Sequence, residues 1–218
     1  MWRGVIFDLD GTLVDSLPGI TASLNRALAA CGFPDHGQAA VRGCVGCGAR
    51  ELARRALPAG LDQADDVAAR VEAAFRDDYG RTWRDGTRAY PGIPEELAAL
   101  TDQGARLAVL SNKPHPFTVA MVADLLPGIA FAAVLGQRDG VPRKPDPAAA
   151  HEACRAMDCR NGEVVLAGDS TVDMETARNA GLAAAAVTWG YHDRAALAAF
   201  RPDLWLDRVG ELRGLAGR

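Results

Sequence analysis

Apolar residues follow two patterns along the chain, and the change from one to the other divides the sequence. Six short runs are almost uniformly apolar: "RGVIFD" (3–8), "ARLAVLS" (105–111), "FAAVLGQ" (131–137), "EVVLAGD" (163–169), "GLAAAAV" (181–187) and "DLWLD" (203–207). From residue 86 onward, these runs alternate with helical patterns. Uniformly apolar strands separated by helices are typical of a parallel sheet covered on both faces. We therefore predict an α/β fold built on a doubly wound parallel sheet.

The stretch between the first two apolar runs has a different texture. Helical spacing of apolar residues recurs at 18–32, 49–60 and 63–83, with no convincing strand between these segments. The first apolar run shares its character with the later ones, so it belongs with their sheet. We predict an α/β core formed by residues 1–16 and 86–218, interrupted by an all-helical insert at residues 17–85.

Composition and charge exclude several classes of protein. The chain has 218 residues, of which 49% are hydrophobic, which is enough for a large core. Its net charge of -4 gives no basic footprint for nucleic acid or an anionic membrane. No apolar run approaches the ~18 residues that a membrane span needs. The five cysteines are an odd number, and the first strand leaves no room for a signal peptide. We expect a reduced, cytoplasmic protein.

Polar residues stand where several predicted strands end. Asp8 follows the first strand, with Asp10 two residues later; Ser111 and Asp169 end later strands. In doubly wound sheets, ligands bind outside the carboxyl ends of the strands, so these side chains are expected at one edge. Asp173 falls in the first turn of a helix that Ser170 or Thr171 can cap.

A cation is needed to hold these acids together. Asp8, Asp10, Asp169 and Asp173 would gather against Lys144 alone, since we rank Lys113 as a surface residue. Two like charges ~4 Å apart repel by about 4 kcal/mol at an effective dielectric of ~20. Oxygen ligands without His or Cys favour Mg²⁺, which is also the usual partner of phosphates. The pattern predicts a site for Mg²⁺ and a phosphoryl group.

Four motifs, in order along the chain, resemble those of the haloacid dehalogenase superfamily of hydrolases. They are "DLDGTLVDS" (8–16), Ser111 in "LAVLSNK", Lys144 in "KPDP" and "GDSTVD" (168–173). The helical insert resembles the cap of that superfamily. The resemblance implies that Asp8 attacks phosphorus and that Asp10 acts as acid and base. It also implies that Ser111, Asn112 and Lys144 hold the phosphoryl oxygens. The implied Mg²⁺ ligands are Asp8, Asp10 through its main-chain carbonyl, Asp169 and Asp173.

Within the superfamily, the chain looks most like the phosphoglycolate phosphatases, which share "YPGIPEELAAL" and the "SNKP" form of the second motif. Cys47 departs from the polar residue expected between Gly46 and Gly48. This resemblance implies that 2-phosphoglycolate is the substrate. The glycine-flanked loop "GCVGCGAR" (43–50) is expected to read the substrate carboxylate through Arg50 or Arg42 and through loop amides.

Other readings remain open beside this one. The chain could hydrolyse another small phosphorylated metabolite, act as a phosphomutase, or be a catalytically silent binding protein on the same fold. Asp10 argues against a dehalogenase, because dehalogenases lack the second acid of the first motif. Residues 17–85 contain no lysine, which argues against a phosphonatase. The sequence leaves the oligomeric state open.

Overall fold

The computed structural model describes residues 2–61 and 64–216. The chain forms two compact units, one of Met1–Val14 with Ala89–Arg218 and one of Asp15–Arg88. The predicted core ended at residue 16 and resumed at residue 86. Gln63, with which one predicted helix began, lies outside the described residues, as do the two ends of the predicted core.

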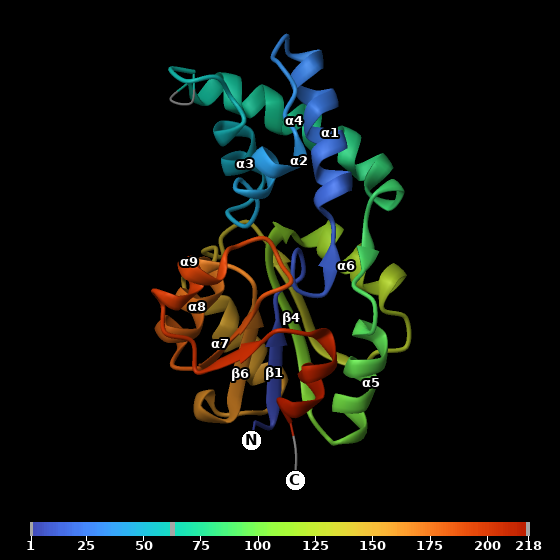
Figure 1. The fold of residues 1–218 in the computed structure, drawn as a ribbon, viewed down its shortest axis with the longest axis vertical. Helices are drawn as coiled ribbons and strands as arrows, with labels where there is room; N and C mark the ends of the chain where they lie inside the picture. The colour runs from blue at the N-terminus through green and yellow to red at the C-terminus, as the bar shows by residue number, and fades with distance from the viewer. Residues whose placement is uncertain (1, 62–63, 217–218) are drawn as a thin grey trace. The chain divides into compact units, whose positions relative to one another are not determined.

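The first unit is built on a parallel sheet of six strands in the order β5-β4-β1-β6-β7-β8. Each strand coincides with one of the six apolar runs, which confirms the predicted α/β fold (Figure 1). The strands are β1 (Gly4–Phe7), β4 (Arg106–Pro114), β5 (Phe131–Gln137), β6 (Val164–Gly168), β7 (Ala183–Val187) and β8 (Leu204–Leu206). β1 lies between β4 and β6, so these three strands end side by side.

Helices cover the sheet because alternate side chains of each strand point to opposite faces. Ile6, Ala108 and Leu166 pack into one buried cluster with apolar residues of α7 and α8. The helices of this unit are α5 (Ile93–Asp102), α6 (His115–Leu125), α7 (Ala148–Ala156), α8 (Thr171–Ala180) and α9 (Arg194–Ala198), with 3₁₀ turns η2 (Asn161–Glu163) and η3 (Val209–Gly214). η3 packs on α5, where Arg213 pairs with the buried carboxylate of Glu96.

The second unit is helical, in agreement with its periodicity. It contains α1 (Leu17–Ala30), α2 (Gln38–Arg42), α3 (Ala49–Arg55), α4 (Asp65–Thr82) and the 3₁₀ turn η1 (Trp83–Asp85). α1 packs along α4, and Phe75 stacks on Tyr79 within α4. Two short strands, β2 (Val14–Asp15) and β3 (Arg88–Ala89), pair where the chain passes between the units.

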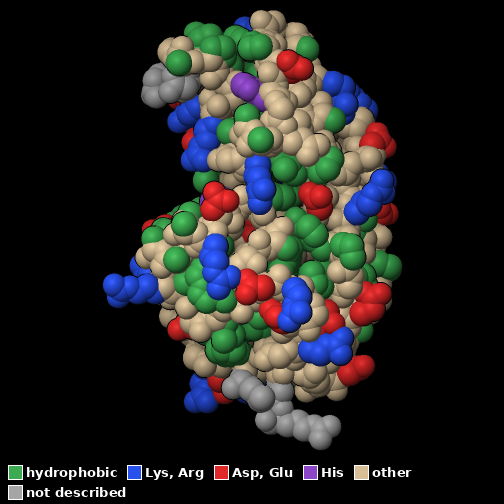
Figure 2. All heavy atoms as spheres, viewed as in Figure 1, with side chains coloured by type: hydrophobic (Ala, Val, Ile, Leu, Met, Phe, Trp, Pro, Cys, Tyr) green, Lys and Arg blue, Asp and Glu red, His purple; other side chains and the backbone are tan. Residues whose placement is uncertain are grey.

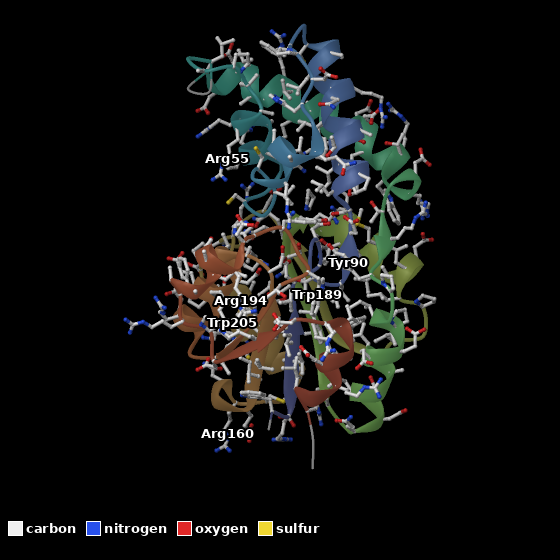
Figure 3. All side chains as sticks on the ribbon, viewed as in Figure 1. Arg55, Tyr90, Arg160, Trp189, Arg194 and Trp205 are labelled. Carbon is white, nitrogen blue, oxygen red and sulfur yellow. The ribbon has the colours of Figure 1, made fainter. Side chains whose placement is uncertain are left out.

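The surface carries charges of both signs. On the face drawn in Figure 2, the Lys and Arg side chains are interspersed with Asp and Glu rather than gathered into one patch. Arg194 illustrates this mixing, because it stacks on Trp205 and pairs with Asp207 (Figure 3). No helix among the described residues is long and apolar enough to cross a membrane.

Candidate active site

The three central strands bring the predicted residues to one edge of the sheet. Asp8 directly follows β1, Asp169 directly follows β6, and Ser111 lies near the carboxyl end of β4. All three side chains are buried. The edge expected from the sequence is therefore present.

Three carboxylates form a compact cluster at this edge. Asp8, Asp169 and Asp173 each place a carboxylate oxygen within 4.8 Å of the other two. Two neutral donors hold Asp169, since the Thr12 hydroxyl donates to it over 2.9 Å and the Tyr191 N–H over 2.7 Å. Together these bonds fix both oxygens of Asp169, and so its orientation toward the cluster.

The turn after β1 allows this close approach. Gly11 has a φ of +85°, and a Cβ added to it would lie 2.3 Å from an Asp169 oxygen. A side chain at this position would therefore be strained and would also clash. The next residue, Thr12, accepts a hydrogen bond through its carbonyl from the Trp189 indole, which is labelled in Figure 3. The turn is thus fastened to the segment that follows β7.

The first turn of α8 orients the third acid. Ser170 is the N-cap, and its hydroxyl accepts the Asp173 N–H. One oxygen of Asp173 in turn accepts bonds from the N–H and the hydroxyl of Ser170, at 3.0 and 2.6 Å. This reciprocal capping satisfies helix donors and leaves the other Asp173 oxygen for a cation.

That other oxygen lies 2.6 Å from the ammonium nitrogen of Lys144, which is also 2.9 Å from Asp8. The backbone of Lys144 is clamped by Asn112, whose amide donates to the Lys144 carbonyl and accepts its N–H. The structure thus brings Asn112 to the site as a residue that positions Lys144. The predicted contact between Asn112 and phosphate remains a prediction.

The prediction for Lys113 is wrong. Its side chain is only 5% exposed, and its ammonium lies 3.0 Å from both oxygens of Asp10. The Asp10 carboxylate therefore faces Lys113 and is not part of the three-acid cluster. The sequence did distinguish Lys113, because Lys113 and Lys144 are the only lysines in the chain. Apart from histidine, every other cationic side chain is an arginine.

The charges of the site call for a further cation. Burial raises the pKa of Asp8 to about 7, with the charge of Asp173 adding to the effect and Lys144 opposing it. Burial raises the pKa of Asp169 to about 8, and the charges of Asp8 and Asp173 raise it further. For Lys144, burial lowers the pKa, but Asp173 and Asp8 outweigh that effect and raise it.

Mg²⁺ fits this donor set. The clustered ligands are carboxylate oxygens, which a hard divalent cation prefers. When ionised, the three clustered carboxylates face the single positive charge of Lys144, and the excess of two negative charges is balanced by one such ion. The residues present would therefore accept Mg²⁺ through Asp8, Asp169 and Asp173.

The predicted specificity residues of the insert lie in the second unit. Gly46 and Gly48 have positive φ values of +112° and +91°, which residues with a side chain rarely adopt. Arg42 is exposed. Arg50 pairs with Glu72, a buried carboxylate of α4, and donates to the carbonyl of Asp65. Their contact with substrate remains a prediction.

Comparisons with known proteins agree with the four motifs. The family described as haloacid dehalogenase-like hydrolase matches residues 5–187. A phosphoglycolate phosphatase of Pectobacterium atrosepticum is 36% identical, covering 99% of this chain and 92% of its own. One from Pseudomonas putida is also 36% identical, covering 98% and 78%. A predicted phosphoglycolate phosphatase from Haemophilus somnus 129PT has a solved structure with a TM-score of 0.89 and 30% identity, covering 98% and 97%.

Proposed function

The chain belongs to the haloacid dehalogenase-like hydrolases, and from that premise we propose that it is a Mg²⁺-dependent phosphatase of small phosphomonoesters. One observation carries the proposal: a buried cluster of three carboxylates lies against Lys144 at the edge where β1, β4 and β6 end. Such a cluster suits a cation and a phosphoryl group, and packing alone gives no reason to bury three carboxylates together.

The first chemical step uses the two acids that follow β1. A carboxylate oxygen of Asp8 forms a bond to phosphorus while the bond from phosphorus to the ester oxygen breaks. Asp10, two residues on, gives its proton to the leaving oxygen. The product is an alcohol and a phosphoryl group carried on Asp8, as in other covalent transfers from carboxylate nucleophiles.

The second step reverses the role of Asp10. Its carboxylate takes a proton from water, the water oxygen bonds to phosphorus, and the bond from Asp8 to phosphorus breaks. Inorganic phosphate leaves and Asp8 is regenerated. Lys144 and the Ser111 hydroxyl are placed to hold the phosphoryl oxygens through both steps, since both groups are buried at the same edge. When bound, Mg²⁺ would neutralise phosphoryl charge in this acidic site.

We further propose 2-phosphoglycolate as the substrate. The support is that the two relatives above, which the chain matches over nearly its whole length, are phosphoglycolate phosphatases. The helical unit then serves as a cap that excludes bulk water during the reaction. Another small phosphorylated metabolite or a mutase reaction would use the same core residues, so the substrate needs its own test.

That test is a screen of purified protein against phosphorylated metabolites and p-nitrophenyl phosphate, with Mg²⁺ or with excess EDTA. We expect phosphate release that EDTA abolishes and Mg²⁺ restores, with 2-phosphoglycolate giving the highest kcat/KM. No hydrolysis of any ester would favour a silent binding protein. Isomerised sugar phosphate without free phosphate would favour a mutase.

A further inference from the structure

The substrate proposed above carries a second negative charge for which the core mechanism provides no partner. In 2-phosphoglycolate, a carboxylate stands one methylene away from the ester oxygen. The first unit is acidic at this edge, so an unpaired carboxylate would be repelled there. A cation must therefore lie near the leaving group, and the question is which residue supplies it.

Lys113 lies at the required place. Its ammonium is 3.0 Å from both oxygens of Asp10, the acid assigned to the leaving oxygen. A general acid works within ~3 Å of the atom it protonates, so an ester oxygen that Asp10 could reach from its present position would lie about 6 Å or less from the Lys113 ammonium. A carboxylate one methylene beyond that oxygen can reach it.

The end of β4 holds Lys113 in this position. Between Leu110 and Pro114 the strand advances four residues while β5 advances two, from Leu135 to Gln137. This irregular stretch contains Ser111 and Lys113, and the Lys113 N–H donates to the Ser111 hydroxyl over 3.2 Å. One backbone feature, the irregular end of β4, therefore positions both Ser111, which would hold phosphate, and Lys113, which would lie beside the leaving group.

Two other candidate cations are already matched by acids. Lys144 bridges Asp8 and Asp173. Arg50 of the insert is paired with the buried Glu72, and Arg76 holds the other oxygen of the same carboxylate. Lys113 is also paired, but its partner is Asp10, the group that must turn to the substrate during the reaction.

We propose that Lys113 is the specificity residue of this site. The substrate carboxylate replaces Asp10 as the partner of the Lys113 ammonium, which Asp10 contacts in the free protein. This inference rests on the proposed function. An ammonium has three N–H donors, so it can bind the incoming carboxylate before Asp10 departs. On leaving the ammonium, Asp10 takes up a proton from solvent and turns to the ester oxygen as a neutral acid. A substrate without the carboxylate leaves Asp10 held by Lys113 and is turned over slowly.

The test compares 2-phosphoglycolate with ethyl phosphate, which has the same length and lacks the carboxylate. Wild type, Lys113→Met and Lys113→Arg are assayed on both substrates with Mg²⁺. Lys113→Met should lower kcat/KM for 2-phosphoglycolate about ten- to a hundredfold more than for ethyl phosphate, the range expected for a lost charge-assisted bond. Lys113→Arg keeps the charge and should restore most of this selectivity.

Two further variants make the test specific. Arg213→Met removes an ion pair with Glu96 in the core, far along the chain from the site residues, and should leave the selectivity unchanged. Arg50→Ala tests the insert. If Arg50→Ala shifts the selectivity and Lys113→Met does not, the insert reads the carboxylate and our inference is overturned.

Binding can be followed without turnover. In an Asp8→Asn background, selective ¹⁵N labelling of lysine yields signals from only two side chains. We expect 2-phosphoglycolate to shift both signals, whereas ethyl phosphate should shift Lys144 alone. Equal losses of kcat/KM on both esters in Lys113→Met, with no substrate-specific shift, would mean that Lys113 only orients Asp10. Wild-type hydrolysis of ethyl phosphate but not of 2-phosphoglycolate would instead contradict the proposed substrate and this inference together.

Discussion

Asp8 and Asp10 are two residues apart, yet the structure gives them different surroundings. Asp8 lies in the acidic cluster and touches Lys144, whereas the Asp10 carboxylate is turned to Lys113. The turn that begins at Leu9 separates them, because the Leu9 carbonyl accepts the N–H groups of Leu13 and Val14. From this difference in surroundings we infer that Asp8 acts as the nucleophile and that Asp10 handles protons.

Replacing Asp10 tests this division of roles. We expect Asp10→Asn to lower kcat by roughly 10²–10⁴, the usual contribution of acid–base catalysis, while Mg²⁺ binding stays largely intact. The effect should be largest with poor leaving groups, which need the proton most. Near-full activity of Asp10→Asn on an alkyl phosphate would remove Asp10 from the mechanism.

The raised pKa values predict how pH acts on the metal-free protein. An unfolded Asp ionises near 3.8, whereas folded Asp8 and Asp169 ionise near 7 and 8. Between the unfolded and the folded pKa values, the folded state therefore holds more protons than the unfolded state, and the stability of the protein falls as pH rises through this range. Mg²⁺ replaces those protons, so it should raise Tm more at pH 8.5 than at pH 5.5. A Tm increase that is the same at both pH values would contradict this.

At the scale of elements, the predictable parts follow from local pattern. The six strands could be predicted because each is a uniformly apolar run, and the common edge follows from their parallel arrangement. The position of Lys113 was missed, because the scarcity of lysine marks the residue but its place depends on the shifted register between β4 and β5. The two neutral donors to Asp169, Thr12 and Tyr191, were missed for a similar reason: they are distant in sequence from their acceptor.

The cap of α8 gives a prediction at this scale. Ser170→Ala removes the capping hydroxyl and its two bonds to Asp173, one accepted from the Asp173 N–H and one donated to its carboxylate, which should destabilise the protein by about 0.5–2 kcal/mol. Asp173 should also lose its orientation, so the apparent affinity for Mg²⁺ should fall. Thermal unfolding with and without Mg²⁺ measures both effects. A variant with lower stability but unchanged Mg²⁺ affinity would show that Asp173 does not depend on this cap.

At the scale of the whole molecule, the proposed catalytic residues lie within one unit. Every described residue of the acidic cluster and both lysines belong to the first unit, while the second unit carries the arginine-rich helices. This division follows from the chain order, because the helical unit is inserted after the first strand and its turn. The core residues are thus expected to set the reaction, and the insert to control access.

The transfer of a phosphoryl group to Asp8 is the central claim, and acid quenching tests it most directly. Protein mixed with Mg²⁺ and ³²P-labelled 2-phosphoglycolate should yield, after a rapid acid quench, a label that is stable to acid and released by alkali. Peptide mapping should place it on Asp8, and neither Asp8→Asn nor protein in excess EDTA should carry it. Phosphate release at the wild-type rate by Asp8→Asn, or a label on another residue, would contradict the account.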